Sequence, residues 1–150
     1  MFADSLLLPE CEFRPRSFSG LMLLYESNFL KYQNLAGLRC DYGQHRISRV
    51  AGDNELHLEA IRQERYTSTL CLSYWLRGPS GLEIKDPDLT IRIYHDAAQV
   101  EAVACRAEHH HQRLSEISQA HATELDRRWR INMMLNKWLD YLLDCGHGFS

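Results

Sequence analysis

The stretch Leu89-Thr90-Ile91-Arg92-Ile93-Tyr94 carries the clearest strand pattern in the chain. Apolar residues at the odd positions alternate with polar residues at the even positions. Successive side chains of a strand point to opposite faces of a sheet, so this pattern predicts a half-buried strand. The leucine and the two isoleucines face the core, and Arg92 and Tyr94 share the opposite face.

Four more segments around this stretch have strand character. Three of them precede it: first a polar segment, then an alternating segment, then a segment rich in β-branched and aromatic residues. The fourth, a segment of small residues, follows it. These expected strands are residues 44–50, 56–60, 66–75 and 99–107. The connections are too short for crossover helices, so neighbouring strands should be antiparallel.

Two amphipathic helices are expected, one before and one after these strands in the sequence. Ser17 or Ser19 caps the first, whose apolar residues from Leu21 to Leu35 recur at three- and four-residue steps. The second runs from about Ile131 to Leu142, and Gly146 ends it. Both apolar stripes need burial. The sequence therefore predicts an α+β fold, in which an N-terminal and a C-terminal helix pack on one face of a four- or five-stranded antiparallel sheet.

Residues 1–16 are expected to be an extended or mobile lead-in, and residues 17–150 a single α+β domain. The chain has 150 residues, of which 45% are hydrophobic and 25% charged, as in an ordinary globular protein. A net charge of −3 predicts no general attraction for nucleic acid or for a membrane surface. Because the chain has no long apolar run and no secretory signal at its start, we expect a cytoplasmic protein.

The five cysteines are odd in number and widely scattered. This usage favours neither a disulfide framework nor a zinc site. Cys71 and Cys105 fall in expected strands and should behave as small buried hydrophobes. No glycine-rich phosphate loop, nucleophile elbow or dinucleotide fingerprint is present, so we expect no cofactor and assign no catalytic residue.

Several segments together resemble a known family. They are residues 89–97 with the strand that follows, residues 65–70, residues 26–29, and residues 131–147 with their Asn132, Trp138 and Cys145-Gly146-His147. In these segments the chain resembles the YqiB-like family of small bacterial cytoplasmic proteins. The resemblance implies a bacterial cytoplasmic protein of unknown function, and it implies no particular activity, cofactor or catalytic residue.

The best candidate for a ligand site lies at the end of the 89–94 strand. Arg92 and Tyr94 share a face there, and His95 and Asp96 follow where the chain turns. Arginine offers a planar fork suited to phosphate or carboxylate, and a tyrosine ring can stack on a ligand. Arg65 and Tyr66 join this group if strand pairing brings them close. The structural alternative is that His95 and Asp96 shape the turn while Arg92 pairs with Asp96 or Glu101.

A second candidate surface, for a protein partner, combines aromatic and basic residues. Trp75 ends a strand, and Trp129 opens the last helix beside Arg127 and Arg128. The alternative is that both tryptophans cap the edges of the core and that the arginines form a solvated first helical turn.

The run His109-His110-His111 is the most conspicuous group of possible metal ligands. Three consecutive side chains fan apart on a helix or a strand, so they make a poor cage for one ion. We therefore assign no metal site from the sequence.

These observations favour a non-enzymatic binding or regulatory module that acts through a protein partner or a small anionic ligand. One alternative is a small hydrolase for a nucleotide-like or phosphorylated substrate, with His95 and Asp96 as its acid–base pair and Arg92 holding phosphate. Another is a homodimeric structural protein that pairs through the uncovered face of its sheet. The mostly polar outward residues favour a monomer or a weak homodimer.

Overall fold

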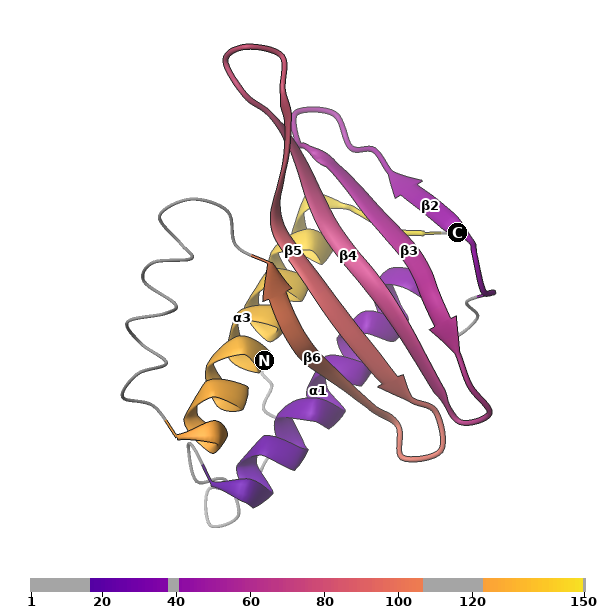
Figure 1. Ribbon diagram of the computed structural model, residues 1–150, viewed down its shortest axis with the longest axis vertical. Coiled ribbons are helices and arrows are strands. Elements are labelled where there is room, and N and C mark those ends of the chain that lie inside the picture. The colour runs from indigo at the N-terminus through magenta and orange to yellow at the C-terminus, as the bar shows by residue number, and fades with distance from the viewer. Residues whose placement is uncertain (1–16, 38–40, 107–122, 150) are drawn as a thin grey trace.

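The computed structural model describes residues 17–37, 41–106 and 123–149. The expected lead-in over residues 1–16 and the His109–His111 run lie outside these residues. In the described part of the chain, five strands and two helices form an α+β fold, as the sequence predicts (Figure 1).

The sheet is an antiparallel meander in which each strand pairs with its neighbours in the sequence, in the order β2-β3-β4-β5-β6. Its strands are β2 (His45–Ser48), β3 (Glu55–Gln63), β4 (Thr67–Arg77), β5 (Glu83–Tyr94) and β6 (Gln99–Arg106). All five expected strands are present. The 89–94 pattern is the second half of β5. The strand itself begins at Glu83, but Pro87 breaks the alternation of apolar and polar residues in its first half.

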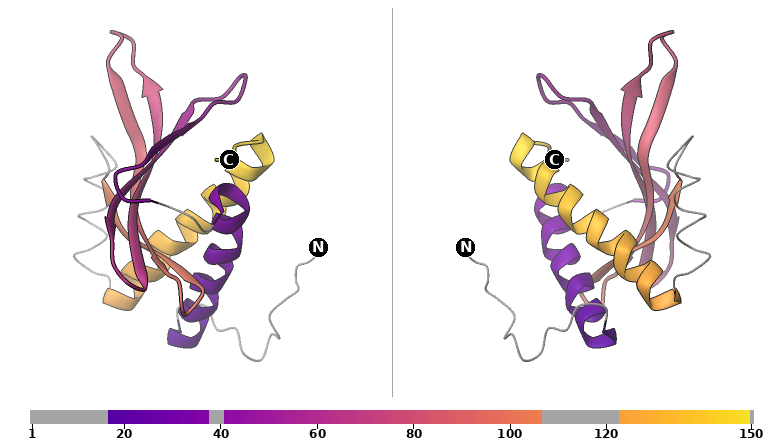
Figure 2. Two further views of the ribbon diagram at one scale, coloured as in Figure 1. Left: turned by 90° about the vertical axis from the view of Figure 1, so that its right-hand side faces the viewer. Right: turned by 90° about the vertical axis from the view of Figure 1, so that its left-hand side faces the viewer.

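Helices α1 (Phe18–Ala36) and α3 (Glu124–Cys145) lie on the same side of the sheet, and no other helix or strand of the described residues covers the opposite side, here called the open face (Figure 2). The Ser17 side chain caps α1 by accepting from the backbone N–H of Gly20 at 3.0 Å. Gly146 ends α3 in the left-handed conformation, with φ of 94°, which glycine adopts without steric cost. The two helix ends therefore form as the sequence predicts.

The main core lies between the helices and the sheet and is built from alternate residues of β3 to β6. Its strand residues with exposed fractions of 1% or less are Leu56, Leu58, Leu70, Leu72, Leu89, Ile91, Ile93, Val100 and Ala102. A smaller cluster between the two helices contains Leu21, Leu24, Tyr25 and Trp129. The expectation that Cys71 and Cys105 are buried fails: Cys71 is half-buried, and Cys105 is exposed although the register sets it opposite core-facing Leu89, because the buried residues of β6 end at Ala102.

Candidate functional site

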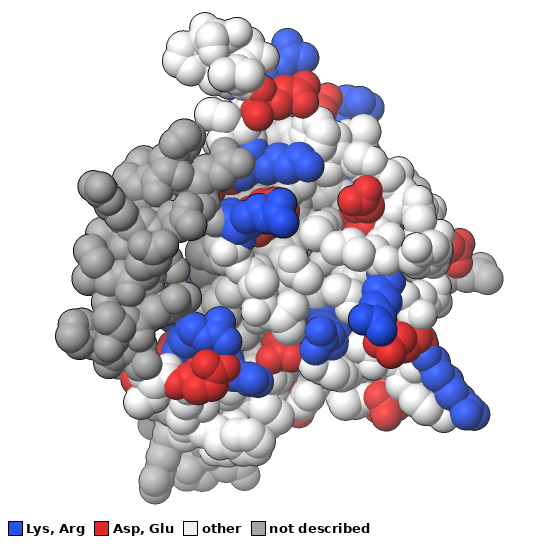
Figure 3. All heavy atoms as spheres, in the orientation of Figure 1, with Lys and Arg blue, Asp and Glu red and all other residues white. Residues whose placement is uncertain are grey.

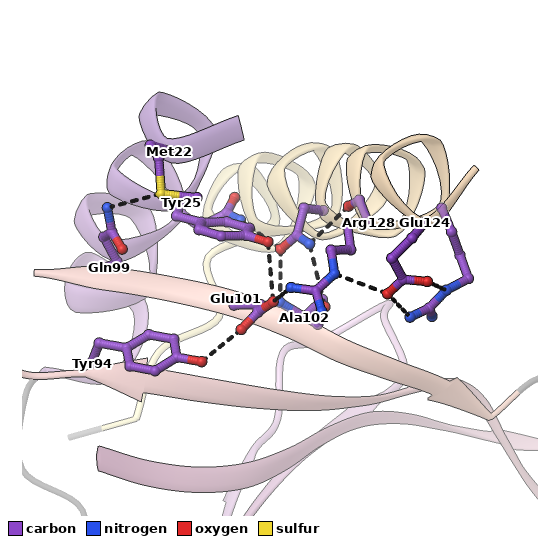
Figure 4. Close-up of polar contacts among 11 residues, drawn as sticks. Met22, Tyr25, Tyr94, Gln99, Glu101, Ala102, Glu124 and Arg128 are labelled. Atoms are coloured by element: carbon purple, nitrogen blue, oxygen red, sulfur yellow. Dashed lines mark hydrogen bonds and ion pairs between the residues drawn. The ribbon is translucent and has the colours of Figure 1, made fainter. Parts of the chain in front are cut away.

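A buried carboxylate, that of Glu101 on β6, connects the open face of the sheet to both helices (Figure 4). Its Oε1 accepts from the Tyr94 hydroxyl of β5 at 2.7 Å. Its Oε2 accepts from the Tyr25 hydroxyl of α1 at 3.0 Å and from the Arg128 guanidinium of α3 at 3.3 Å. Three elements far apart in the sequence therefore meet at one charge, which is paired as a buried charge must be.

The two tyrosines are fixed as hydrogen-bond donors at this carboxylate. Burial, together with the nearby negative charge of Glu101, raises the pKa of Tyr25 far above its usual value. Burial and the hydrogen bond to Glu101 also raise the pKa of Tyr94. Both hydroxyls therefore keep their protons at any physiological pH and donate to Glu101.

The first turn of α3 holds its two arginines in ion pairs on the surface. Glu124 accepts from Arg127 at 3.1 and 2.8 Å and from Arg128 at 2.9 Å. These hydrogen bonds lower the pKa of Glu124 to about 2. Both arginines are thus ion-paired within the first turn of α3, and Arg128 also reaches the buried carboxylate of Glu101.

The candidate ligand group is split by the structure between the two faces of the sheet. Arg92 and Tyr94 share the open face, where Arg92 stands opposite Thr69 on β4 and Glu101 on β6. His95 turns away and its Nε2 lies 2.8 Å from the hydroxyl of Ser68, a buried residue paired with core-facing Ile93.

The neighbouring residues at this end of the sheet shape the two hairpin turns. Asp96 accepts from the backbone N–H of Ala97 at 3.0 Å. Tyr66 accepts, through its carbonyl, the backbone N–H of His95 at 2.9 Å, and the Arg65 guanidinium lies 5.1 Å from the centre of the Tyr66 ring. Strand pairing therefore brings Arg65 and Tyr66 beside His95, but not around Arg92.

The two tryptophans proposed for a partner surface are both packed against other side chains. Trp129 is 8% exposed and belongs to the cluster between the helices. Trp75 is half-buried on the open face, where it stacks on His57 with ring centres 3.8 Å apart and carries Lys85 over its ring.

Sequence reasoning missed Glu101 as the centre of this site and Tyr25 as its partner. The available signal was a single carboxylate at Glu101 between the apolar residues Val100 and Ala102 of an expected strand. Such a residue near the core must find partners, but the sequence did not indicate which ones.

A second polar group contains a serine, a histidine and an aspartate in series. The hydroxyl of Ser48 lies 2.9 Å from Nδ1 of His147, and Nε2 of the same ring lies 2.8 Å from Asp53. The order resembles a hydrolytic triad, but Ser48 is buried and its oxygen also accepts the backbone N–H of Gly148 at 3.1 Å. A nucleophile must be reachable by substrate, so the arrangement serves to hold the C-terminal segment against β2.

In the residues that the structure describes, no group of three or more histidine, cysteine, aspartate or glutamate side chains is arranged to hold a metal ion. Neither of the two described helices is long and apolar enough to cross a membrane.

Comparison with known proteins places these features in a family. Residues 32–148 match the model of a family described as "Protein of unknown function (DUF1249)". The chain is 25% identical over 138 residues to "Uncharacterized protein YqiB" of Escherichia coli strain K12, an alignment that covers 87% of this chain and 90% of the relative. The YqiB proteins of strains CFT073 and O157:H7 match equally well, and no solved structure matches. The chain belongs to the DUF1249 family, whose function is unknown.

Proposed function

We propose that this chain is a binding module that takes a small anionic ligand on the open face of its sheet, with Arg92 as the anion-binding group. The observation that carries the proposal is the strand register around Arg92. The register sets Arg92 between Thr69 and Glu101 and beside Tyr94 on the same face.

The surroundings of Arg92 are rich in hydrogen-bond donors. Thr67, Thr69 and Thr90 are half-buried hydroxyl residues on the same face, paired with Tyr94, Arg92 and Cys71 respectively. The Arg92 guanidinium carries five N–H donors in a planar fork. A phosphate or carboxylate group matches such an arrangement.

The charge distribution favours a small ligand over a polyanion. On the open face, basic and acidic side chains are intermixed, and an uncharged area crosses the middle of the sheet (Figure 3). Nucleic-acid binding usually depends on a continuous basic patch or stripe. The described residues in this view form none, in keeping with the net charge of −3.

The geometry gives less support to the hydrolase and the tryptophan-based partner surface. A hydrolytic site needs His95, Asp96 and Arg92 to converge on one reacting group, whereas His95 turns toward Ser68 and Asp96 binds its own turn. A partner surface needs exposed aromatic anchors, whereas Trp129 is buried and half-buried Trp75 packs against His57 and Lys85.

The test is a thermal-shift screen with inorganic phosphate, nucleoside mono- and diphosphates, phosphorylated sugars and dicarboxylates. A ligand at ~100 times its Kd stabilises the fold by about 2.7 kcal/mol. For a chain of this length that raises Tm by about 5–10 °C. We expect at least one anion to raise Tm in the wild type and in Arg49→Ala, and to have no effect on Arg92→Ala.

Arg49 is a matched control because it is an exposed arginine paired with Glu55, outside the group around Arg92. The unliganded Tm of both variants should stay near that of the wild type. If no anion in the screen stabilises the wild type, or if the stabilisation persists in Arg92→Ala, the proposal is wrong.

A further inference from the structure

Two histidines of neighbouring strands face each other on the open side of the sheet. Nε2 of His45 on β2 lies 2.9 Å from Nδ1 of His57 on β3. His45 is exposed, whereas His57 is 5% exposed beneath its neighbours. The pair lies outside the Arg92 site and has no part in the proposed anion binding.

The buried histidine is held in the form that a metal ligand requires. Its Nε2 lies 3.1 Å from a carboxylate oxygen of Glu55, so the proton belongs on Nε2 and the lone pair on Nδ1 points toward His45. A histidine that binds a metal usually donates its other ring nitrogen to a carboxylate in this way. Glu55 is in turn held by Arg49, whose Nε donates to its second oxygen at 2.8 Å.

The surroundings of His57 hold this ring in one orientation. Trp75 stacks on the ring with an interplanar angle of 8°, which fixes its orientation. Packing therefore fixes the His57 ring in advance, and the exposed His45 leaves the pair accessible from solvent.

The two nitrogens are separated by the length of a hydrogen bond, and this separation also suits one class of ion. Two nitrogens bound at right angles, each ~2.05 Å from a metal, lie about 2.9 Å apart, whereas a tetrahedral ion separates them by about 3.4 Å. Nitrogen ligands at right angles are typical of square-planar or tetragonal Cu²⁺ and Ni²⁺. Of these, Cu²⁺ binds such ligands more strongly.

We propose that His45 and His57 form a binding site for a divalent transition-metal ion of tetragonal geometry, with Cu²⁺ preferred. The hydrogen bond between the two rings is given up as His45 moves its proton to Nδ1, and the ion lies to one side of the line between the two nitrogens, where it binds both. Both imidazoles stay neutral, and water completes the coordination because no third protein ligand of the described residues joins the pair.

Trp75 supplies a spectroscopic signal for the test, because a bound Cu²⁺ ion quenches a tryptophan stacked on its ligand. The background is the full chain with His109→Ala, His110→Ala and His111→Ala, which removes the other histidine-rich segment. In this protein at pH 7.5, we expect Cu²⁺ to quench fluorescence saturably with one ion per chain. We also expect an electron paramagnetic resonance spectrum of a tetragonal Cu²⁺ with two imidazole nitrogens.

His45→Ala should weaken binding at least ~10-fold, and Glu55→Ala by about 10-fold through loss of the carboxylate that orients His57. Trp75→Phe should bind Cu²⁺ with the same spectrum and lose most of the quenching. His95→Ala, which changes an exposed histidine in the β5–β6 turn, should leave both affinity and spectrum unchanged.

His45 is exposed on an edge strand, so its loss leaves the fold intact, which far-ultraviolet circular dichroism checks. Quenching that does not saturate, or a His45→Ala variant with unchanged affinity and spectrum, would overturn the proposal.

Discussion

Asp53 lies in the turn between β2 and β3, and its carboxylate accepts hydrogen bonds from two residues far along the chain. His147 donates to it at 2.8 Å from the C-terminal segment, and Tyr74 donates to it from β4. Burial tends to raise the pKa of Asp53, but these two hydrogen bonds outweigh it, and the pKa lies below the usual 3.8. The charged form is therefore the form that stabilises the fold.

A lowered carboxyl pKa makes stability depend on pH in one direction. The native state binds the proton more weakly than the unfolded chain, so the contribution is complete above about pH 4 and is lost as pH falls through the native pKa. We expect Asp53→Asn to lower the free energy of unfolding by about 2 kcal/mol at pH 7. The difference from the wild type should shrink below pH 4, as urea unfolding at several pH values will show.

The matched control is Asp144→Asn, which changes an exposed carboxylate near the end of α3. It should change stability little at either pH. A difference between Asp53→Asn and the wild type that stays constant from pH 7 to pH 3 would contradict the role assigned to Asp53.

At the scale of elements, the free edge of β6 is covered by side chains from the two helices. The Asn132 amide of α3 accepts from the backbone N–H of Ala102 at 2.7 Å and donates to its carbonyl at 3.3 Å. Asn28 of α1 donates to the carbonyl of Val100 at 3.2 Å and to Asn132 at 3.3 Å. An exposed edge strand invites pairing with another chain, and these amides occupy the groups through which it would pair.

Replacing Asn132 by leucine keeps the volume and removes these hydrogen bonds. The backbone N–H and carbonyl of Ala102 are then buried without a partner, at a cost of about 3 kcal/mol in the free energy of unfolding. Urea unfolding measures this cost, and the Ala102 amide should also exchange its hydrogen faster than in the wild type. Asn34→Leu, an exposed position on α1, is the control and should cost much less. A loss below ~1 kcal/mol in Asn132→Leu would argue against edge protection by this residue.

At the scale of the molecule, the C-terminal segment joins elements that are otherwise far apart. His147 binds Ser48 and Asp53 beside β2, and the backbone N–H of Phe149 donates to the carbonyl of Leu35 at the end of α1 at 2.8 Å. The Arg46 guanidinium lies 5.5 Å from the centre of the buried Phe149 ring. The last residues thus fasten the β2 edge of the sheet to the helix layer, as the C-terminus beside β2 in Figure 1 shows.

A chain that ends at Gly146 tests this role. We expect hydrogen exchange to speed up at β2 and at the turn that contains Asp53, whereas β4 and β5 keep their protection because the core residues Leu70 and Ile91 are untouched. A chain that lacks only Ser150 is the control and should exchange like the full chain. Equal exchange at β2 in the two shortened chains would show that the segment does not fasten this edge.

The sequence by itself determined the elements and the faces that they bury. Alternation over residues 89–94 and the apolar stripes of both helices depend on neighbours a few residues apart, and so do the caps at Ser17 and Gly146. The same local signals placed Arg92 and Tyr94 on one face and gave the antiparallel order, because short connections leave no other pairing.

Tertiary structure alone decided which polar side chains meet. Glu101 joins Tyr25 and Arg128, His45 faces His57, and His95 turns away from Arg92. Each of these depends on strand register, on a bulge, or on how a helix crosses the sheet. Such features arise from packing between segments distant in the sequence, where a shift of one residue moves a side chain to the other face.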